Sequence, residues 1–181
     1  MSPINQSKFL DLKRSRSAHC SPLKFLDEYK IGLHVDPVIY ELRKEFDFRL
    51  GMKLTDLARV DLRCDTLNRD STYLGFSKER LMLPSNVIGS LHTRSTLARI
   101  GLDFFGSSTY VSPGFGAETP TKIVFEITAR VQVRNLPLHE HVAGLVLYQI
   151  NGVDAVWRGK GNHASRFPFV DLAARHSPVS E

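Results

Sequence analysis

The segment that most constrains the fold of this chain is residues 122–133, KIVFEITARVQV, because its side chains alternate in character. One set is apolar throughout: Ile123, Phe125, Ile127, Ala129, Val131 and Val133. Successive side chains of a β-strand point to opposite faces of a sheet, so this alternation predicts a strand with one face in the core. Glu126 belongs to the other set and is expected on the face away from the core.

Most of the remaining chain consists of short β-prone segments separated by Gly, Pro and polar clusters. These patterns predict further strands at 46–51, 104–105, 110–111 and 145–150. A short helix is expected at Val38–Lys44, since Asp36 suits an N-cap and Pro37 suits the first helical position. Many strands with few helices indicate a mainly β fold, either a distorted β-barrel or a double sheet.

The 181 residues suit one domain with short extensions, because domains commonly span about 100–200 residues. The polar, basic segment 1–24 is expected to be a loosely attached arm, 25–156 the central domain, and 157–181 a closing arm. No stretch has the length and apolarity of a membrane span or a signal peptide. Cys20 and Cys64 form no CxxC pair, so a reducing, cytoplasmic location is expected.

The chain is basic, with 24 Lys and Arg against 19 Asp and Glu, a formal net charge of +5. An anionic partner is therefore favoured, although a solvated basic surface explains the same composition. Nucleic acid is an unlikely partner, because no aromatic residues are interleaved with the basic cluster at Lys13–Arg16.

The segment Arg94–Arg99, RSTLAR, places two guanidinium groups around two hydroxyls. Guanidinium groups and hydroxyls both bind phosphate oxygens, and a helical turn starting here adds backbone N–H donors. The alternative is an amphipathic turn that packs its apolar side chains inward. Glu126 offers a carboxylate that could move protons, against the simpler interpretation of a solvated strand residue.

Two further segments carry polar groups of chemical interest. Residues 157–166, WRGKGNHASR, could form a mobile basic arm over a polyphosphate, or a flexible solvated tail. His139-Glu140-His141 has the spacing of a metal pair, but an exposed loop explains it equally well, and no metal site is assigned. The chain lacks the H-x-E and P-C-x-x-C motifs of zinc nucleobase deaminases.

Taken together, these segments resemble the dCTP deaminase branch of the dUTPase superfamily. Residues 83–102, LPSNVIGSLHTRSTLARIGL, are similar to the family's Pro-led strand and its G-R-S-S-L-A-R-x-G-L motif. Pro113-Gly114-Phe115 matches the P-G-[FW] turn, and Phe125-Glu126-Ile127 matches the L-E-[FIL] strand. More loosely, 46–51 resembles the V-D-L-R-L-G strand, and 157–166 resembles the C-terminal arm.

The resemblance implies a dUTPase-like fold, a homotrimer with sites between subunits, and hydrolytic deamination of dCTP to dUTP and ammonia without zinc. By this resemblance Glu126 moves the protons, while Ser95 and Arg99 orient the water and stabilise the reacting centre. The nucleotide would bring Mg²⁺ on its own phosphate oxygens. The nucleotide-binding residues would be Arg94, Thr96, Ser108, Thr109, Ser112, Arg158 and Lys160.

Two positions differ from the family pattern. Ser108 stands where a small Ala is usual, and Ser112 stands where an Asp precedes the P-G turn. Two alternatives therefore stay open: a dUTP diphosphatase, alone or combined with deamination, and a non-catalytic nucleotide-binding or regulatory paralogue. For the diphosphatase, Asp103 is the nearest candidate carboxylate in the sequence.

Overall fold

The alternating segment forms β10 (Thr121–Ala129), a strand in the middle of a sheet. Its core-facing side chains, Ile123, Phe125, Ile127 and Ala129, are at most 4% exposed, which confirms the predicted one-sided strand. The strand is shorter than expected: it ends at Ala129, and the N–H of Arg130 makes one further bond to the carbonyl of Gly101, just before β8 (Leu102–Phe105). Beyond this point Val131 is 40% exposed instead of buried.

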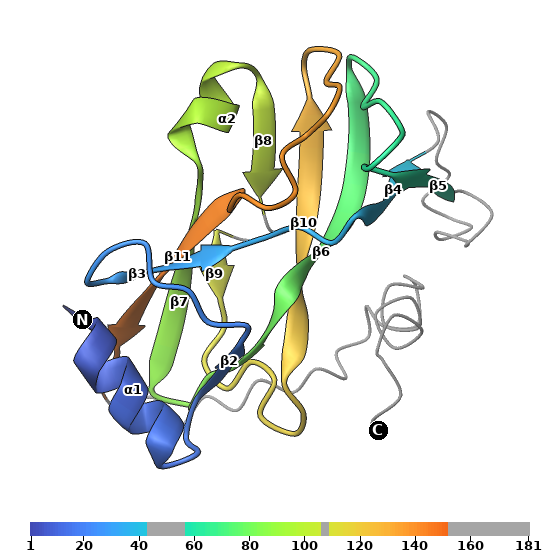
Figure 1. Cartoon of the computed structure of the whole chain (residues 1–181). Coiled ribbons are helices and arrows are strands. Elements are labelled where there is room, and N and C mark those ends of the chain that lie inside the picture. The colour runs from blue at the N-terminus through green and yellow to red at the C-terminus, as the bar shows by residue number, and fades with distance from the viewer. Residues whose placement is uncertain (43–56, 106–108, 152–181) are drawn as a thin grey trace.

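The computed structural model describes residues 1–42, 57–105 and 109–151, and these residues form two antiparallel sheets and two helices. In the six-stranded sheet the order is β5-β4-β6-β10-β8, with β2 added to β6 (Figure 1). Its other strands are β2 (His19–Ser21), β4 (Val38–Leu42), β5 (Leu57–Asp61), β6 (Ser71–Met82) and β8 (Leu102–Phe105).

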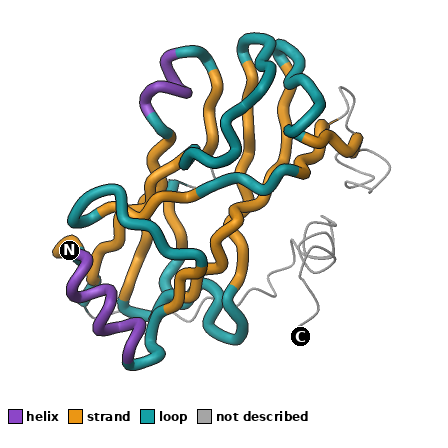
Figure 2. The backbone as a smooth tube through the Cα atoms, in the orientation of Figure 1, coloured by secondary structure: helices purple, strands orange, loops and turns teal. Residues whose placement is uncertain are grey.

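The five-stranded sheet has the order β1-β11-β7-β9, with β3 also paired to β11. Its strands are β1 (Ser2–Pro3), β3 (Lys30–Leu33), β7 (Val87–Thr93), β9 (Tyr110–Val111) and β11 (Ala143–Gln149). Buried side chains from both sheets belong to one large hydrophobic cluster, so the core lies between the sheets. The helices α1 (Gln6–Arg14) and α2 (Ser95–Arg99) lie toward opposite ends of the molecule (Figure 2). The mainly β, double-sheet prediction is confirmed.

Two predictions about the N-terminal part of the chain are wrong. Val38–Leu42 form the strand β4 instead of a helix, because pairing with β5 and β6 outweighs the local capping signal. Segment 1–24 is not a loose arm: β1 pairs with β11, β2 pairs with β6, and Phe9 of α1 is 1% exposed. The predicted strand 46–51 lies outside the described residues.

The inner face of β6 carries two buried polar residues, Ser77 and Glu79. The Glu79 carboxylate accepts the backbone N–H of His34 at 2.9 Å and lies 2.8 Å from the His34 Nδ1 atom. Ser77 Oγ accepts the N–H of Ile123, where the β6–β10 register shifts between Lys122 and Val124. These bonds satisfy polar groups that would otherwise be costly to bury.

Gly116 lies in the connection between β9 and β10 and has a positive φ of 69°. A Cβ at this position would lie 2.3 Å from the backbone carbonyl oxygen of Leu81. Because this atom belongs to the backbone of a strand, it cannot rotate away as the end of a flexible side chain could. We expect Gly116→Ala to reduce the free energy of unfolding by more than about 2 kcal/mol, measured by urea denaturation.

The matched control is Gly144→Ala, whose added Cβ meets the flexible side chain of Lys30. We expect a clearly smaller loss for this control. Equal losses for the two variants would contradict the steric account of Gly116.

Candidate functional site

The helix α2 begins directly after β7 and brings several predicted site residues together at one end of the core. Leu97 is 7% exposed and anchors the helix in the main hydrophobic cluster, while Ser95, Thr96 and Arg99 are exposed. The predicted helical turn is confirmed. The turn packs Leu97 inward but leaves Ala98 exposed, so the amphipathic interpretation holds only for Leu97, and the two hydroxyls and Arg99 face outward.

Arg94 is the N-cap residue of α2 and links the helix to the chain before β11. Its carbonyl oxygen accepts the N–H groups of Leu97 and Ala98, and its own N–H donates to the carbonyl of Val142 at 2.9 Å. The guanidinium is ion-paired through Nη1 to the carboxylate of Glu140. Arg94 therefore has a fixed backbone and a side chain that is already paired.

Glu126 lies on the outer face of β10, as the alternation predicted, and is partly exposed. Its direct partner in the register of β6 is Leu74, which is 5% exposed. Two residues earlier on the same face, Val124 packs against the buried pair Tyr40 and Phe76. The carboxylate thus borders a small apolar cluster on the outside of the sheet.

The helix α2 and Glu126 are separate parts of the candidate site within one chain. The loop after α2 meets the end of β10 at Gly101 and Arg130, and Glu126 lies about 13 Å back along the strand at about 3.3 Å per residue. Among the described residues, no hydrogen bond or ion pair joins Glu126 to Ser95 or Arg99. The structure therefore groups Arg94, Ser95, Thr96 and Arg99, but leaves Glu126 apart from them.

Two other predicted nucleotide-binding residues lie around β9. The carbonyl of Thr109 accepts the N–H of Leu91 at 2.8 Å, which places Thr109 beside the strand that leads into α2. Ser112 is exposed, and its carbonyl accepts the N–H of Phe115, which closes the predicted P-G-F turn. Ser108, Arg158 and Lys160 lie outside the described residues.

No local sequence pattern indicates the polar residues that surround Arg94. In the sequence Glu140 is notable only as the residue between the two histidines of a candidate metal pair, yet it pairs with Arg94. Burial is the main cause that lowers the pKa of His141 below its ordinary 6.5, followed by the nearby Arg94, His34, Lys24 and Lys30. Within the described ranges, no group of three or more His, Cys, Asp and Glu could hold a metal ion.

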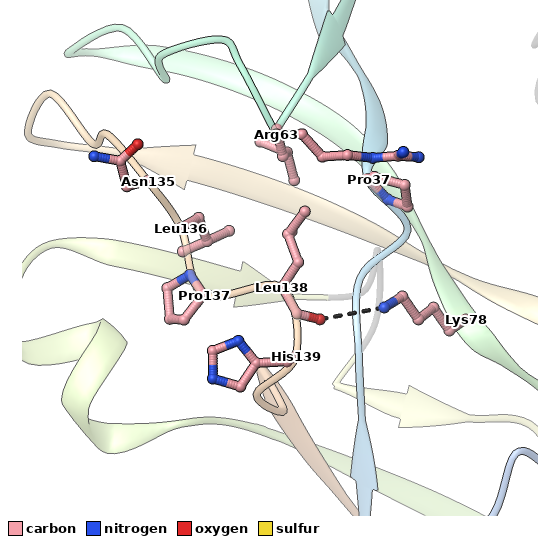
Figure 3. Close-up of a pocket in the computed structure, with 9 residues that line it drawn as sticks. Pro37, Arg63, Lys78, Asn135, Leu136, Pro137, Leu138 and His139 are labelled. Atoms are coloured by element: carbon pink, nitrogen blue, oxygen red, sulfur yellow. Dashed lines mark hydrogen bonds between the residues drawn. The ribbon is translucent and has the colours of Figure 1, made fainter.

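An open pocket of about 730 Å³ lies beside the loop that precedes β11 (Figure 3). Leu136 and Leu138 line it together with Lys78, whose Nζ donates to the carbonyl of Leu138 at 3.2 Å. No predicted catalytic or nucleotide-binding residue lines this pocket. It is therefore not assigned to the candidate site.

The lowered pKa of His141 predicts a specific pH dependence of stability. As the pH falls through 6.5, this histidine takes up a proton in the unfolded chain before it does so in the folded chain. The free energy of unfolding therefore decreases as the pH falls. We expect the free energy of unfolding to decrease less for His141→Gln than for the wild type when the pH is lowered from about 7.5 to about 5.5, measured by urea denaturation. Parallel pH profiles for the two proteins would contradict this assignment.

Comparisons with known proteins indicate the family and the fold of this chain. A family described as dCTP deaminase-like matches residues 34–146. A solved structure of 2′-deoxycytidine 5′-triphosphate deaminase from Agrobacterium tumefaciens is similar to this chain, with a TM-score of 0.58 and 16% identity. The match covers 81% of this chain and 48% of that one, so this chain spans about half of its length.

A native EIAV dUTPase structure also matches, with a TM-score of 0.39, 13% identity, and coverage of 74% of this chain and 98% of that one. No curated protein matches the chain. None of the described helices is long and apolar enough to cross a membrane. Since the family match includes β4, α2 and β10 and extends over more than half of the sequence, the chain belongs to the dCTP deaminase-like family.

Proposed function

We propose that this protein deaminates dCTP, or a closely related cytosine nucleotide, by hydrolysis to the uracil nucleotide and ammonia. The observation that carries the proposal is the combination of two features in a chain of this family. The hydroxyls of Ser95 and Thr96 and the guanidinium of Arg99 are exposed on α2, where they can contact a nucleotide, and β10 presents Glu126 beside an apolar cluster.

The proposed reaction needs one group that first accepts a proton and then returns it. Water adds to C4 of the cytosine ring as Glu126 takes one of its protons, which forms the C4–O bond. Glu126 passes this proton to ring N3 as the N3=C4 double bond becomes single. It then takes the proton of the added hydroxyl and passes it to the exocyclic nitrogen, so that the C4–N bond breaks, ammonia leaves and the C4=O bond forms. A single positioned carboxylate can perform both transfers. Ser95 and Arg99 would orient the water and stabilise charge at the reacting centre.

The surface at and next to α2 also offers groups that can bind the phosphates of the nucleotide. Arg94 and Thr96 would bind the triphosphate, with Ser108, Thr109, Ser112, Arg158 and Lys160 as further nucleotide contacts. Hydroxyl and guanidinium groups suit phosphate oxygens better than a cation, so Mg²⁺ would be held by the triphosphate itself. The proposed reaction therefore requires no protein-bound zinc.

A homotrimer would complete the site. Ser95 and Arg99 have no bond to Glu126 within one described chain, and α2 closes the end of the core while Glu126 faces outward from the sheet. A neighbouring copy could bring its own α2 to the Glu126 face of this chain, which agrees with the trimer that the family resemblance implies.

The described geometry supports deamination better than hydrolysis of dUTP. The diphosphatase alternative needs a carboxylate that can hold water near the α-phosphate, and Asp103 was its candidate. The Asp103 side chain is 14% exposed and lies 3.7 Å from the guanidinium of Arg130. A carboxylate that is already paired and largely buried is a poor choice for this role, whereas Glu126 has no such partner among the described residues.

We expect Glu126→Gln to lower dCTP turnover more than about 10³-fold, because the amide cannot accept and return the proton. Release of ammonia and uracil nucleotide is measured with dCTP and Mg²⁺, and binding is measured separately by calorimetry. Affinity for dCTP should remain close to that of the wild type.

Glu28→Gln is the matched control, because Glu28 is exposed and only its backbone carbonyl makes a described hydrogen bond, with the N–H of Gln6. This variant should keep full turnover. Undiminished turnover by Glu126→Gln would remove Glu126 from the mechanism.

The products also distinguish the alternative functions. Binding of CTP, dCTP, dCMP or dUTP without any product would favour the non-catalytic paralogue, and release of pyrophosphate from dUTP would favour the diphosphatase.

A further inference from the structure

The ion pair between Arg94 and Glu140 places an acidic group directly at the proposed phosphate-binding surface. The two residues are separated by 46 positions in the sequence. A turn closed by the N–H of Glu140 and the carbonyl of Pro137, at 3.0 Å, presents Glu140 to the start of α2. Arg94 is fixed from the other side by its bond to Val142. The backbones of both partners are thus held in place before any ligand arrives.

The pair is accessible to a ligand. The side chains of Arg94 and Glu140 are 28% and 39% exposed, so water and solutes reach both. An ion pair of this exposure contributes only about 0–1 kcal/mol, which a phosphate group can readily displace. Only Nη1 of Arg94 contacts Glu140, so other donors of the guanidinium remain for an anion.

We propose that Glu140 is an affinity-setting residue that competes with phosphate for Arg94 and holds down the affinity of the site for highly charged nucleotides. The inference rests on the proposed function in taking a nucleoside triphosphate as the ligand. A carboxylate beside Arg94 cancels its charge and repels the bound anion. The repulsion grows with the number of phosphates, because Coulomb energy is proportional to the charge of the ligand.

The test compares wild type and Glu140→Gln in calorimetric titrations with dCTP, dCMP and inorganic tripolyphosphate at an ionic strength of about 0.1 M. For charges separated by about 8 Å in screened water, the variant should bind dCTP about fourfold more tightly and dCMP about twofold more tightly. Tripolyphosphate, which has no base, should show the same direction of change as dCTP. The differences should shrink as salt is added.

Two control variants separate this role from a structural one. Glu140→Asp keeps the negative charge and should bind dCTP nearly as the wild type does. Asp11→Asn removes a negative charge from α1, toward the opposite end of the molecule from α2, and should leave binding unchanged (Figure 1). Weaker or unchanged dCTP binding by Glu140→Gln, or equal gains for dCTP and dCMP, would overturn the inference.

The binding titrations and the deamination assay test the role of Glu140 and the proposed function separately. If dCTP is not deaminated but the charge-dependent gain in affinity appears, the proposed function fails and the role of Glu140 stands. If dCTP is deaminated and Glu140→Gln shows no gain, the proposed function stands and the role of Glu140 fails. If no variant binds dCTP or tripolyphosphate, both proposals are overturned.

Discussion

The pairing of β10 with β6 is the constraint on which the rest of this structure depends. β6 also pairs with β4 and β2, so its register with β10 positions much of one sheet. The register is held at its irregular point by Ser77, whose hydroxyl accepts the N–H of Ile123. A slip of one residue would turn Glu126 into the core and expose Phe125. The same alternation therefore builds the core and presents the proposed catalytic carboxylate.

The part of the candidate site that is proposed to bind phosphate depends on different contacts. Leu97 anchors α2 in the core, and Arg94 connects the helix to the chain before β11. In the folded chain Arg94 lies close to Glu140, which is 46 residues away in the sequence, and to the following residue, His141. Proton transfer is assigned to Glu126 of β10, whereas Glu140 contacts Arg94 next to α2, so substitutions at Glu126 and Glu140 should affect chemistry and binding, respectively.

Local patterns predicted the parts of the site that depend on local structure. The alternation around Glu126 was sufficient to place its side chain outside the core, and the RSTLAR segment was sufficient to predict α2. The helix expected at Val38–Lys44 failed because strand pairing with distant β5 and β6 outweighed Asp36 and Pro37. The pair between Arg94 and Glu140 joins positions 46 residues apart, so no local pattern could reveal it.

In the proposed trimer, α2 of one copy and Glu126 of another form a single site. The most direct test of this arrangement mixes two inactive variants, Ser95→Ala and Glu126→Gln, after dissociation and reassembly, and measures ammonia release from dCTP. The account predicts recovery of about a quarter of wild-type activity, because random mixing makes about one interface in four intact on both sides. Activity no greater than the sum of the two separate variants would contradict it.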